Sequence, residues 1–360
     1  MRKTGKGWLL LSALCLIGLN SLAQDYPTLS QQSQRLKMLA NSPKVRLGSI
    51  TTTRGGNDIW MLTLGTGDVD NKPAMVVVGG VEGAHLLGVE LATQFAEGII
   101  NDHSDVLENT TFYVFPNMSP DATEQYFAKL KYERSGNARQ TDDDRDGSIN
   151  EDPFEDLNGD GLVTWMRVED ATGDWITHPA DDRVMIKADK EKGEKGRYKI
   201  FTEGMDNDKD GSFNEDGEGG VHFRKNFTFE YPYFVPGSGE HSVSEKENRA
   251  MLDLLYTKWN VYGVFTFGPG NNLSTPWKYN RGGASKRVVT SILAGDAKLN
   301  KFASDAYNDA LKLKDAPASG QQGGDFLQWA YFHFGRLSLG TPGWWAPTVK
   351  GDSTMTANKD

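Results

Sequence analysis

Two residues whose side chains can hold a metal or move a proton, Glu82 and His85, stand three positions apart. Glu and His are residue types that ligate zinc and act as general acids or bases. The five residues before this segment, 74–78, form an apolar run rich in valine, as in a strand buried on both faces. Apolar residues then recur at helical spacing over 86–100. The pair is therefore predicted on a strand-to-helix turn at the carboxyl end of a central strand, where ligands bind in open α/β sheets.

The elements that must position this pair alternate along the chain. Strand patterns at 58–64, 74–78, 111–115, 261–267 and 337–339 alternate with helix patterns at 86–100, 250–259, 299–313 and 325–334. Two signals mark helix starts: Pro120 at a first helical position, and a capping-box pattern at 244–247. Repeated strand-then-helix order predicts an α/β fold with a mixed, mostly parallel sheet and helices on both faces.

The alternation stops between residues 135 and 219. This stretch is acidic and glycine-rich, with little periodicity. It predicts an insertion that elaborates one side of the domain without a core of its own. No apolar stretch within it is long enough to span a membrane.

Three segments of the insertion carry alternating carboxylates followed by glycine. Residues 142–152 read DDDRDGSINED, residues 206–216 read DNDKDGSFNED, and residues 156–161 read DLNGDG. Oxygens at positions one, three and five of such a loop converge on a hard cation, and without a cation the carboxylates repel one another. The twelfth positions hold Pro153, Arg167 and Gly217, so the bidentate Glu of an EF-hand is absent, and a solvated acidic loop is the alternative. The expected ligands of structural Ca²⁺ are Asp142, Asp144, Asp146, Asp156, Asn158, Asp160, Asp206, Asp208 and Asp210.

The first 23 residues read as a secretory signal peptide: basic residues, an apolar stretch over 8–19, and small residues at the cleavage positions. They predict a secreted or periplasmic mature domain of residues 24–360. The single cysteine lies in this segment, so the mature domain has no thiol or disulfide. Cleavage takes the formal charge from −10 to −13, because the segment carries three basic residues and no acidic ones. That charge, and the lack of a basic patch of the type that binds nucleic acid, argue against nucleic acid as a partner.

Taken together, residues 73–342 resemble the zinc carboxypeptidases of peptidase family M14, and the Asp-rich insertion resembles that of a bacterial subset. The family's Gly-x-His-x-x-Glu zinc motif is similar to Gly80-Val81-Glu82-Gly83-Ala84-His85. Its Pro-x-x-Asn-Pro-Asp-Gly segment is similar to residues 116–122, and its Gly…Ser-Glu-x-Glu helix start to residues 239–247. Its Gly-Val-Asp-Leu-Asn-Arg-Asn-Phe segment, which binds the substrate carboxylate, is similar to residues 220–227. The third zinc ligand, nine residues before Pro-Trp, corresponds to Phe267.

The departures from the family pattern fall on the chemistry. A catalytic zinc needs three protein ligands and an open position. Here the first two ligand types are exchanged, as Glu82 and His85, and Phe267 cannot coordinate a metal. The family's general base is a late Glu, yet no Glu follows Glu247. These vestigial positions predict that zinc is not bound and that no confident catalytic residue is present.

Three further positions complete the expected site. The family's carboxylate-binding Asn-Arg pair becomes Arg224-Lys225, which keeps positive charge for a substrate. The Asp that supports the first zinc-binding His becomes His222, so a direct contact between Glu82 and His222 is expected. Either Arg134 or Arg139 takes the place of the family's transition-state arginine, and the sequence does not select between them.

Two functions follow from the resemblance. In the first, the protein is a non-catalytic carboxypeptidase homologue that binds peptide or cell-wall peptide termini. In the second, it is an active zinc metallocarboxypeptidase in which Glu82, His85 and His222 form a new ligand set and another carboxylate is the base. The sequence indicates neither the ligand nor the oligomeric state.

Overall fold

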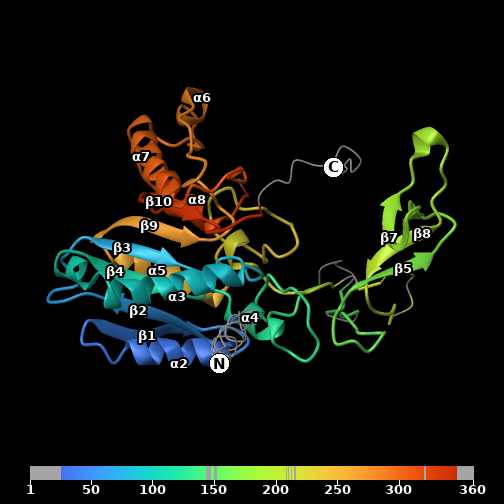
Figure 1. Ribbon diagram of the computed structural model, residues 1–360, viewed down its shortest axis with the longest axis horizontal. Helices are drawn as coiled ribbons and strands as arrows, with labels where there is room; N and C mark the ends of the chain where they lie inside the picture. The colour runs from blue at the N-terminus through green and yellow to red at the C-terminus, as the bar shows by residue number, and fades with distance from the viewer. Residues whose placement is uncertain are drawn as a thin grey trace, which may run out of the picture.

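The computed structural model describes residues 26–142, 147–149, 152–207, 209, 211, 213, 214, 216–319 and 322–346. The predicted signal peptide lies outside these residues. The main body is built on a six-stranded sheet of order β1-β2-β4-β3-β9-β10 (Figure 1). Its strands are β1 (Val45–Thr52), β2 (Asp58–Leu64), β3 (Ala74–Val78), β4 (Thr111–Phe115), β9 (Val261–Phe267) and β10 (Leu337–Thr341). No helix of the described residues is long and apolar enough to cross a membrane.

The sheet is mixed, as predicted. β3 runs parallel to both β4 and β9, and β10 runs parallel to β9. The two remaining pairings, β1 with β2 and β2 with β4, are antiparallel. Because β3 and β9 are central and parallel, their carboxyl ends meet at one edge of the sheet, where the Glu82 turn and Phe267 lie.

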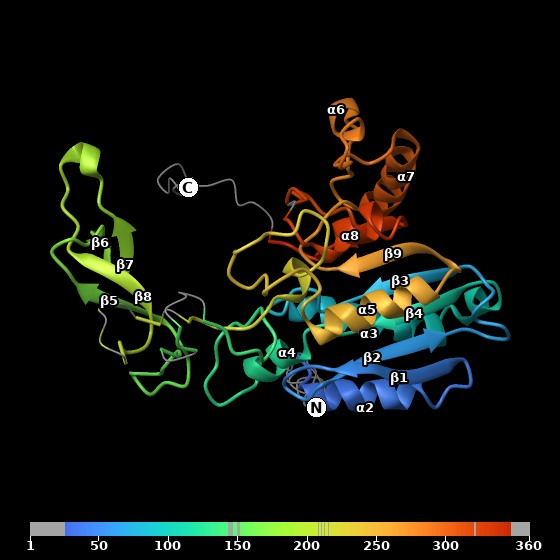
Figure 2. The ribbon, with the colours of Figure 1, turned by 180° about the vertical axis from the view of Figure 1, so that it is seen from behind.

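Helices cover both faces of the sheet. The helices of the described residues are α2 (Leu29–Leu39), α3 (Leu86–Asn101), α4 (Pro120–Tyr126), α5 (Lys246–Thr257), α6 (Arg281–Ala284), α7 (Ala294–Leu311) and α8 (Phe326–Phe332). The short 3₁₀ turns are η1 (Ser104–Glu108), η2 (Lys190–Lys192), which lies in the insertion, and η3 (Phe223–Lys225). α3 lies in front of the sheet in Figure 1, and α5 lies in front of it in Figure 2. Alternate residues of β3 enter opposite cores: Val76 and Val78 pack with α5 and α8, and Val77 packs with α2 and α3.

The predicted capping box at 244–247 is wrong. α5 begins at Lys246 with Glu245 as its N-cap, and no side chain caps the helix. The Glu245 carboxylate instead accepts hydrogen bonds from Asn137 and Arg139, and the Ser244 hydroxyl donates to the same carboxylate. Long-range polar contacts have therefore replaced the local cap.

The insertion contains a second sheet, which the sequence pattern did not predict. Its strands, β5 (Trp165–Glu169), β6 (Trp175–His178), β7 (Asp181–Lys187) and β8 (Tyr198–Thr202), pair antiparallel in the order β5-β8-β6-β7. Both views show this sheet standing to one side of the main body (Figures 1 and 2). Every residue of its four strands is at least partly exposed, so the usual alternation of apolar and polar residues is weak.

Candidate functional site

The turn between β3 and α3 carries Glu82 and His85 where the sequence predicts them. Gly80 has a left-handed φ of +63°, and a Cβ there would lie 2.5 Å from the Asn117 side-chain oxygen. Glycine is therefore needed for the β3 turn to approach the turn that follows β4. His85 is the N-cap residue of α3, and its backbone N–H donates to the Glu82 carbonyl at 3.0 Å.

The Glu82 carboxylate is engaged in an ion pair that the sequence reading did not predict. Its Oε2 accepts from Arg224 Nη1 at 3.0 Å, and Arg224 Nε donates to Asp325 Oδ2 at 3.3 Å. Only 16%, 8% and 11% of the Glu82, Arg224 and Asp325 side chains are exposed. The three residues come from the β3–α3 turn, from η3 and from the N-cap of α8. They form a buried carboxylate–guanidinium–carboxylate chain that ties three distant segments together.

Asp325 has two roles in this chain. Its Oδ1 accepts from the Leu327 N–H at 2.8 Å, which caps α8, while its Oδ2 faces Arg224. Burial raises the pKa of Asp325, and the charge of Arg224 opposes that rise. The Arg224 guanidinium thus forms ion pairs with two desolvated carboxylates at once.

The His85 ring is folded over the first turn of its own helix. A Cβ at Gly88 would lie 2.7 Å from His85 Nδ1, so glycine makes room for the ring. Burial lowers the pKa of His85, while a hydrogen bond to the backbone of Pro342 and the Glu82 charge act in the opposite direction. Burial thus favours the neutral imidazole, and its Nδ1 is buried with no hydrogen-bond partner among the described residues.

Phe267 is the last residue of β9, and its side chain packs against apolar residues. Its ring contacts that of Phe265, with 4.9 Å between centroids, and lies against the core on the α2 and α3 side. A phenyl ring has no donor atom with a lone pair for a metal. The position that the resemblance assigns to a third zinc ligand is filled by a core residue.

The predicted direct contact between Glu82 and His222 is wrong. His222 Nε2 lies 3.1 Å from Glu218 Oε1, and Arg224 holds the Glu82 carboxylate. His222 precedes η3 in extended conformation, and a Cβ at Gly237 would clash with its ring. Two residues further on, the 3₁₀ turn brings Arg224 toward the β3–α3 turn instead.

The comparisons with known proteins decide the family. The family model described as zinc carboxypeptidase, peptidase family M14, matches residues 33–339. This chain belongs to the zinc carboxypeptidase family.

Individual relatives are distant. Carboxypeptidase SOL1 from Arabidopsis thaliana is 26% identical over 136 residues, which cover 34% of this chain and 26% of that protein. The chain thus matches about a quarter of the length of this curated relative.

Solved structures of zinc carboxypeptidases share the fold. Bovine thrombin-activatable fibrinolysis inhibitor, solved in complex with tick carboxypeptidase inhibitor, is 12% identical with a TM-score of 0.53, covering 88% of this chain and 85% of its own. Carboxypeptidase A from Helicoverpa armigera is 13% identical with a TM-score of 0.52, and the match covers 92% of this chain and 70% of that structure's chain.

The residues at the family's zinc position do not fit a catalytic zinc. In the part of the chain that the structure describes, no three His, Cys, Asp or Glu side chains converge as metal ligands. The alternative set of Glu82, His85 and His222 is not assembled, because Glu82 pairs with Arg224 and His222 pairs with Glu218. A guanidinium keeps its positive charge in proteins, so it competes with a cation for Glu82.

A hollow of about 610 Å³ lies beside the segment that resembles the family's carboxylate-binding motif. Val221 of that segment lines it, together with Tyr233, Phe234 and Arg139. Arg139 is the arginine that faces this hollow, and it is paired with Glu240 and with Glu245. Arg134 donates instead to the Asn137 carbonyl at 2.5 Å.

Of the two predicted substrate-binding residues, Lys225 is the more accessible. Its Nζ donates to the Pro236 carbonyl at 3.3 Å, and Pro236 lines the same hollow. The Arg224 side chain is buried in its ion pairs and does not extend to solvent. The role of Arg224 in substrate binding stays a prediction, and the structure shows its guanidinium paired with Glu82 and Asp325.

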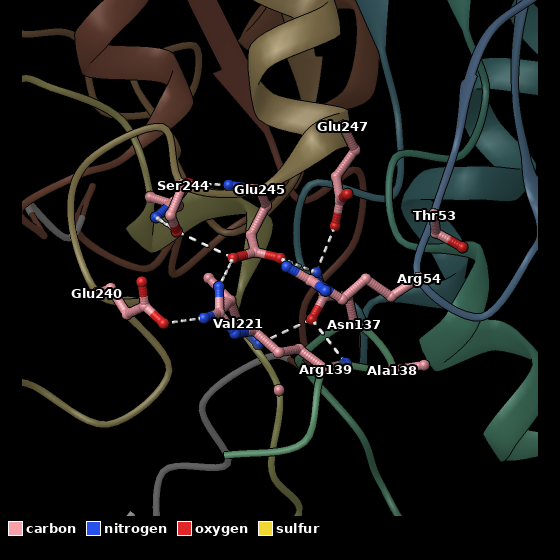
Figure 3. A network of polar contacts seen from close by, with 12 residues as sticks. Thr53, Arg54, Asn137, Ala138, Arg139, Val221, Glu240, Ser244, Glu245 and Glu247 are labelled. Carbon is pink, nitrogen blue, oxygen red and sulfur yellow. Dashed lines mark hydrogen bonds and ion pairs between the residues drawn. The ribbon is translucent and has the colours of Figure 1, made fainter. Parts of the chain in front are cut away.

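A polar network behind the hollow joins the insertion to α5 (Figure 3). Asn137 Nδ2 donates to Glu245 Oε2 at 2.9 Å and to Glu247 Oε1 at 2.7 Å. Burial raises the pKa of Glu247 to about 7. Burial also opposes ionisation of Glu245, but hydrogen bonds from Asn137, Arg139 and Ser244 together lower its pKa. Asp325 carried only the signal of a polar residue before an apolar run, and Asn137, between Gly136 and Ala138, carried no such signal.

Of the predicted calcium ligands, Asp144, Asp146, Asp208 and Asp210 lie outside the described residues. In the loop at 156–161, the Asp156 carboxylate accepts from the backbone N–H groups of Gly159, Asp160 and Gly161. Asn158 accepts from the Asp160 N–H, and Asp160 from the Leu162 N–H. These oxygens thus have protein donors in their own loop, and Ca²⁺ binding stays a prediction.

Proposed function

We propose that this protein is a secreted or periplasmic, non-catalytic member of the zinc carboxypeptidase family that binds peptide or cell-wall peptide termini without cutting them. The observation that carries the proposal is the buried chain of Glu82, Arg224 and Asp325 at the family's zinc position. Its central charge is a guanidinium instead of a metal ion.

Electrostatic repulsion from Arg224 disfavours zinc at this position. Two unit charges 4 Å apart interact by about 4 kcal/mol at an effective dielectric constant near 20, and a divalent ion doubles that. A Zn²⁺ at Glu82 would meet the Arg224 charge at such a distance unless the arginine left its pocket. Leaving would strip Asp325 of its cation, and breaking a buried pair costs about 3–5 kcal/mol.

The argument for terminus binding rests on Lys225 and the hollow next to it. The ammonium is partly exposed and is held at the rim by the Pro236 carbonyl. A free α-carboxylate is a suitable partner for such a point charge. The apolar Tyr233, Phe234 and Val235 offer contacts for the neighbouring side chain of a peptide.

One experiment tests both halves of the proposal. Protein purified without chelator is assayed for zinc, for release of C-terminal residues, and for binding of peptides with free or amidated C-termini. We expect no stoichiometric zinc, no release, and a preference for the free carboxylate that Lys225→Ala abolishes and the exposed-site control Lys298→Ala does not. Equal affinity for the amidated peptide would contradict terminus binding.

One observation favours the alternative of an active zinc metallocarboxypeptidase. Glu82 Oε1 and His85 Nδ1 are both buried and lack hydrogen-bond partners among the described residues. These are atom types that ligate zinc, although a catalytic site needs a third protein ligand. A stoichiometric zinc content that Glu82→Gln and His85→Phe each abolish, together with peptide hydrolysis, would establish this alternative.

A further inference from the structure

The strand register of the insertion sheet places aromatic and basic side chains on one face. Paired residues of antiparallel strands share a face, and side chains alternate along each strand. Trp175 pairs with both Tyr198 and Lys187, and Arg167 pairs with Ile200. Trp165 lies two positions from Arg167 on β5, so it shares the same face. We call this the aromatic–basic face: Trp165, Arg167, Trp175, Lys187, Tyr198 and Ile200.

The aromatic–basic face is open to solvent. The Trp165 residue is 77% exposed. A hollow of about 580 Å³ is lined by both tryptophans together with Arg167, Arg183, Met185 and Ile200. That volume lies within the range typical of small-molecule sites. The sheet projects from the main body in both ribbon views (Figures 1 and 2).

The opposite face of the sheet is different in character. Phe201 points there, since it follows Ile200, and its ring contacts Phe213 with 4.8 Å between centroids. Residues from the returning loop thus pack on that face. Of the two faces of the insertion sheet, the aromatic–basic face is therefore the one whose large apolar side chains are less covered by other residues.

Cations and rings on this face are already arranged together. The Arg167 guanidinium lies over the Tyr198 ring at 5.4 Å, and Lys187 Nζ lies over the Trp175 ring at 5.8 Å. Such stacking fixes a positively charged group without neutralising it. The whole chain carries a formal charge of −10, so a local basic patch stands out against its surroundings.

We propose that the aromatic–basic face binds an acidic glycan, a chain of sugar rings that carry carboxylates. The flat apolar faces of Trp165 and Trp175 suit the C–H faces of sugar rings, and the Arg167 fork suits a carboxylate. A nucleic acid fits less well, because its binding needs several cations along a run of phosphates, whereas the cations of the aromatic–basic face are Arg167 and Lys187. The proposal is independent of what the main body binds.

The test uses the full chain and tetragalacturonate in titration calorimetry. We expect binding of the acid but not of its methyl ester, which keeps the rings and lacks the charge. Trp165→Ala and Arg167→Ala should each weaken binding about tenfold, in line with the worth of one stacking or charged contact.

Two matched controls separate this face from general effects. Trp259→Ala removes an exposed tryptophan of the main body, and Lys199→Ala removes a cation from the opposite face of the insertion sheet. Neither should change the affinity, and circular dichroism should show all four variants folded. Equal binding of the methyl ester, tighter binding of oligothymidylate or of an oligoglutamate peptide, or no binding of the acid would each overturn the proposal.

Discussion

Replacing Arg224 with methionine should destabilise the fold in a pH-dependent way. The substitution removes the guanidinium between Glu82 and Asp325 and keeps most of the side-chain length. Losing one partner of a buried pair costs about 3–5 kcal/mol, because a desolvated charge is left without compensation. At about 2.1 cal/mol/K of unfolding entropy per residue, that corresponds to a fall of roughly 4–7 °C in melting temperature for a domain of this size.

The pH dependence follows from Asp325. Burial raises the pKa of Asp325 in the folded state, so the folded protein binds this proton more tightly than the unfolded chain does. A carboxyl group whose pKa is raised by folding lowers the stability of the folded protein as pH rises above the pKa of the unfolded chain. The loss continues up to the pKa of the folded state. Without Arg224 the folded pKa should rise further. The penalty in Arg224→Met should therefore be small near pH 4 and grow toward neutral pH.

The assay is urea unfolding of both proteins from pH 4 to pH 8, with Arg35→Met as the matched control. Arg35 also bridges two carboxylates, Glu90 and Glu97, but 25% of its side chain is exposed. Exposed pairs contribute about 1 kcal/mol or less. The reasoning is refuted if Arg224→Met costs no more than the control, or if its cost does not grow with pH.

Three further predictions concern other parts of the molecule. Burial raises the pKa of Glu247 to about 7, above its unfolded value, so its contribution to stability is lost as pH rises from about 4.5 to 7. Glu247→Gln should therefore be more stable than the parent at pH 8, by about 1–3 kcal/mol, and nearly equal at pH 4, which urea titration measures. If the acidic loops bind Ca²⁺, adding Ca²⁺ at 100 times its Kd should stabilise the protein by about 2.7 kcal/mol, and Asp156→Asn should reduce that gain. A melting temperature that is the same with Ca²⁺ and with chelator would exclude the loops as structural sites. The last prediction concerns a combined variant with the substitutions Glu82→His, His85→Glu, Phe267→His and Arg224→Asn. Calorimetry should show that it binds zinc, yet it should release no C-terminal residue, because no Glu that could act as the family's general base follows Glu247. Peptide hydrolysis by this variant would show that another base is present.

β3 and β4 were predictable from sequence because nearly all of their residues are buried, and β2 and β9 because most of their residues are at least partly buried. The patterns at 58–64, 74–78, 111–115 and 261–267 coincide with β2, β3, β4 and β9. β1 and α2 were not predicted, since only Val45 of β1 and only Gln32 and Leu36 of α2 are buried. The insertion sheet was missed because its strands are exposed throughout.

The partners within the site could not be read from the sequence. The turn that carries Glu82 follows from a local pattern, but Asp325 joins the site from 101 residues beyond Arg224. The choice between His222 and Arg224 as the partner of Glu82 depends on the direction of one 3₁₀ turn. Composition and spacing identify which residue types are available there, and tertiary structure selects the pairs that form.

The most direct test of the central claim is a zinc titration of the chelator-treated protein, followed by calorimetry. We expect no stoichiometric binding at the Glu82 position, because Arg224 holds that carboxylate in a buried ion-pair chain with Asp325. Tight binding of one zinc per chain that Glu82→Gln abolishes would contradict it.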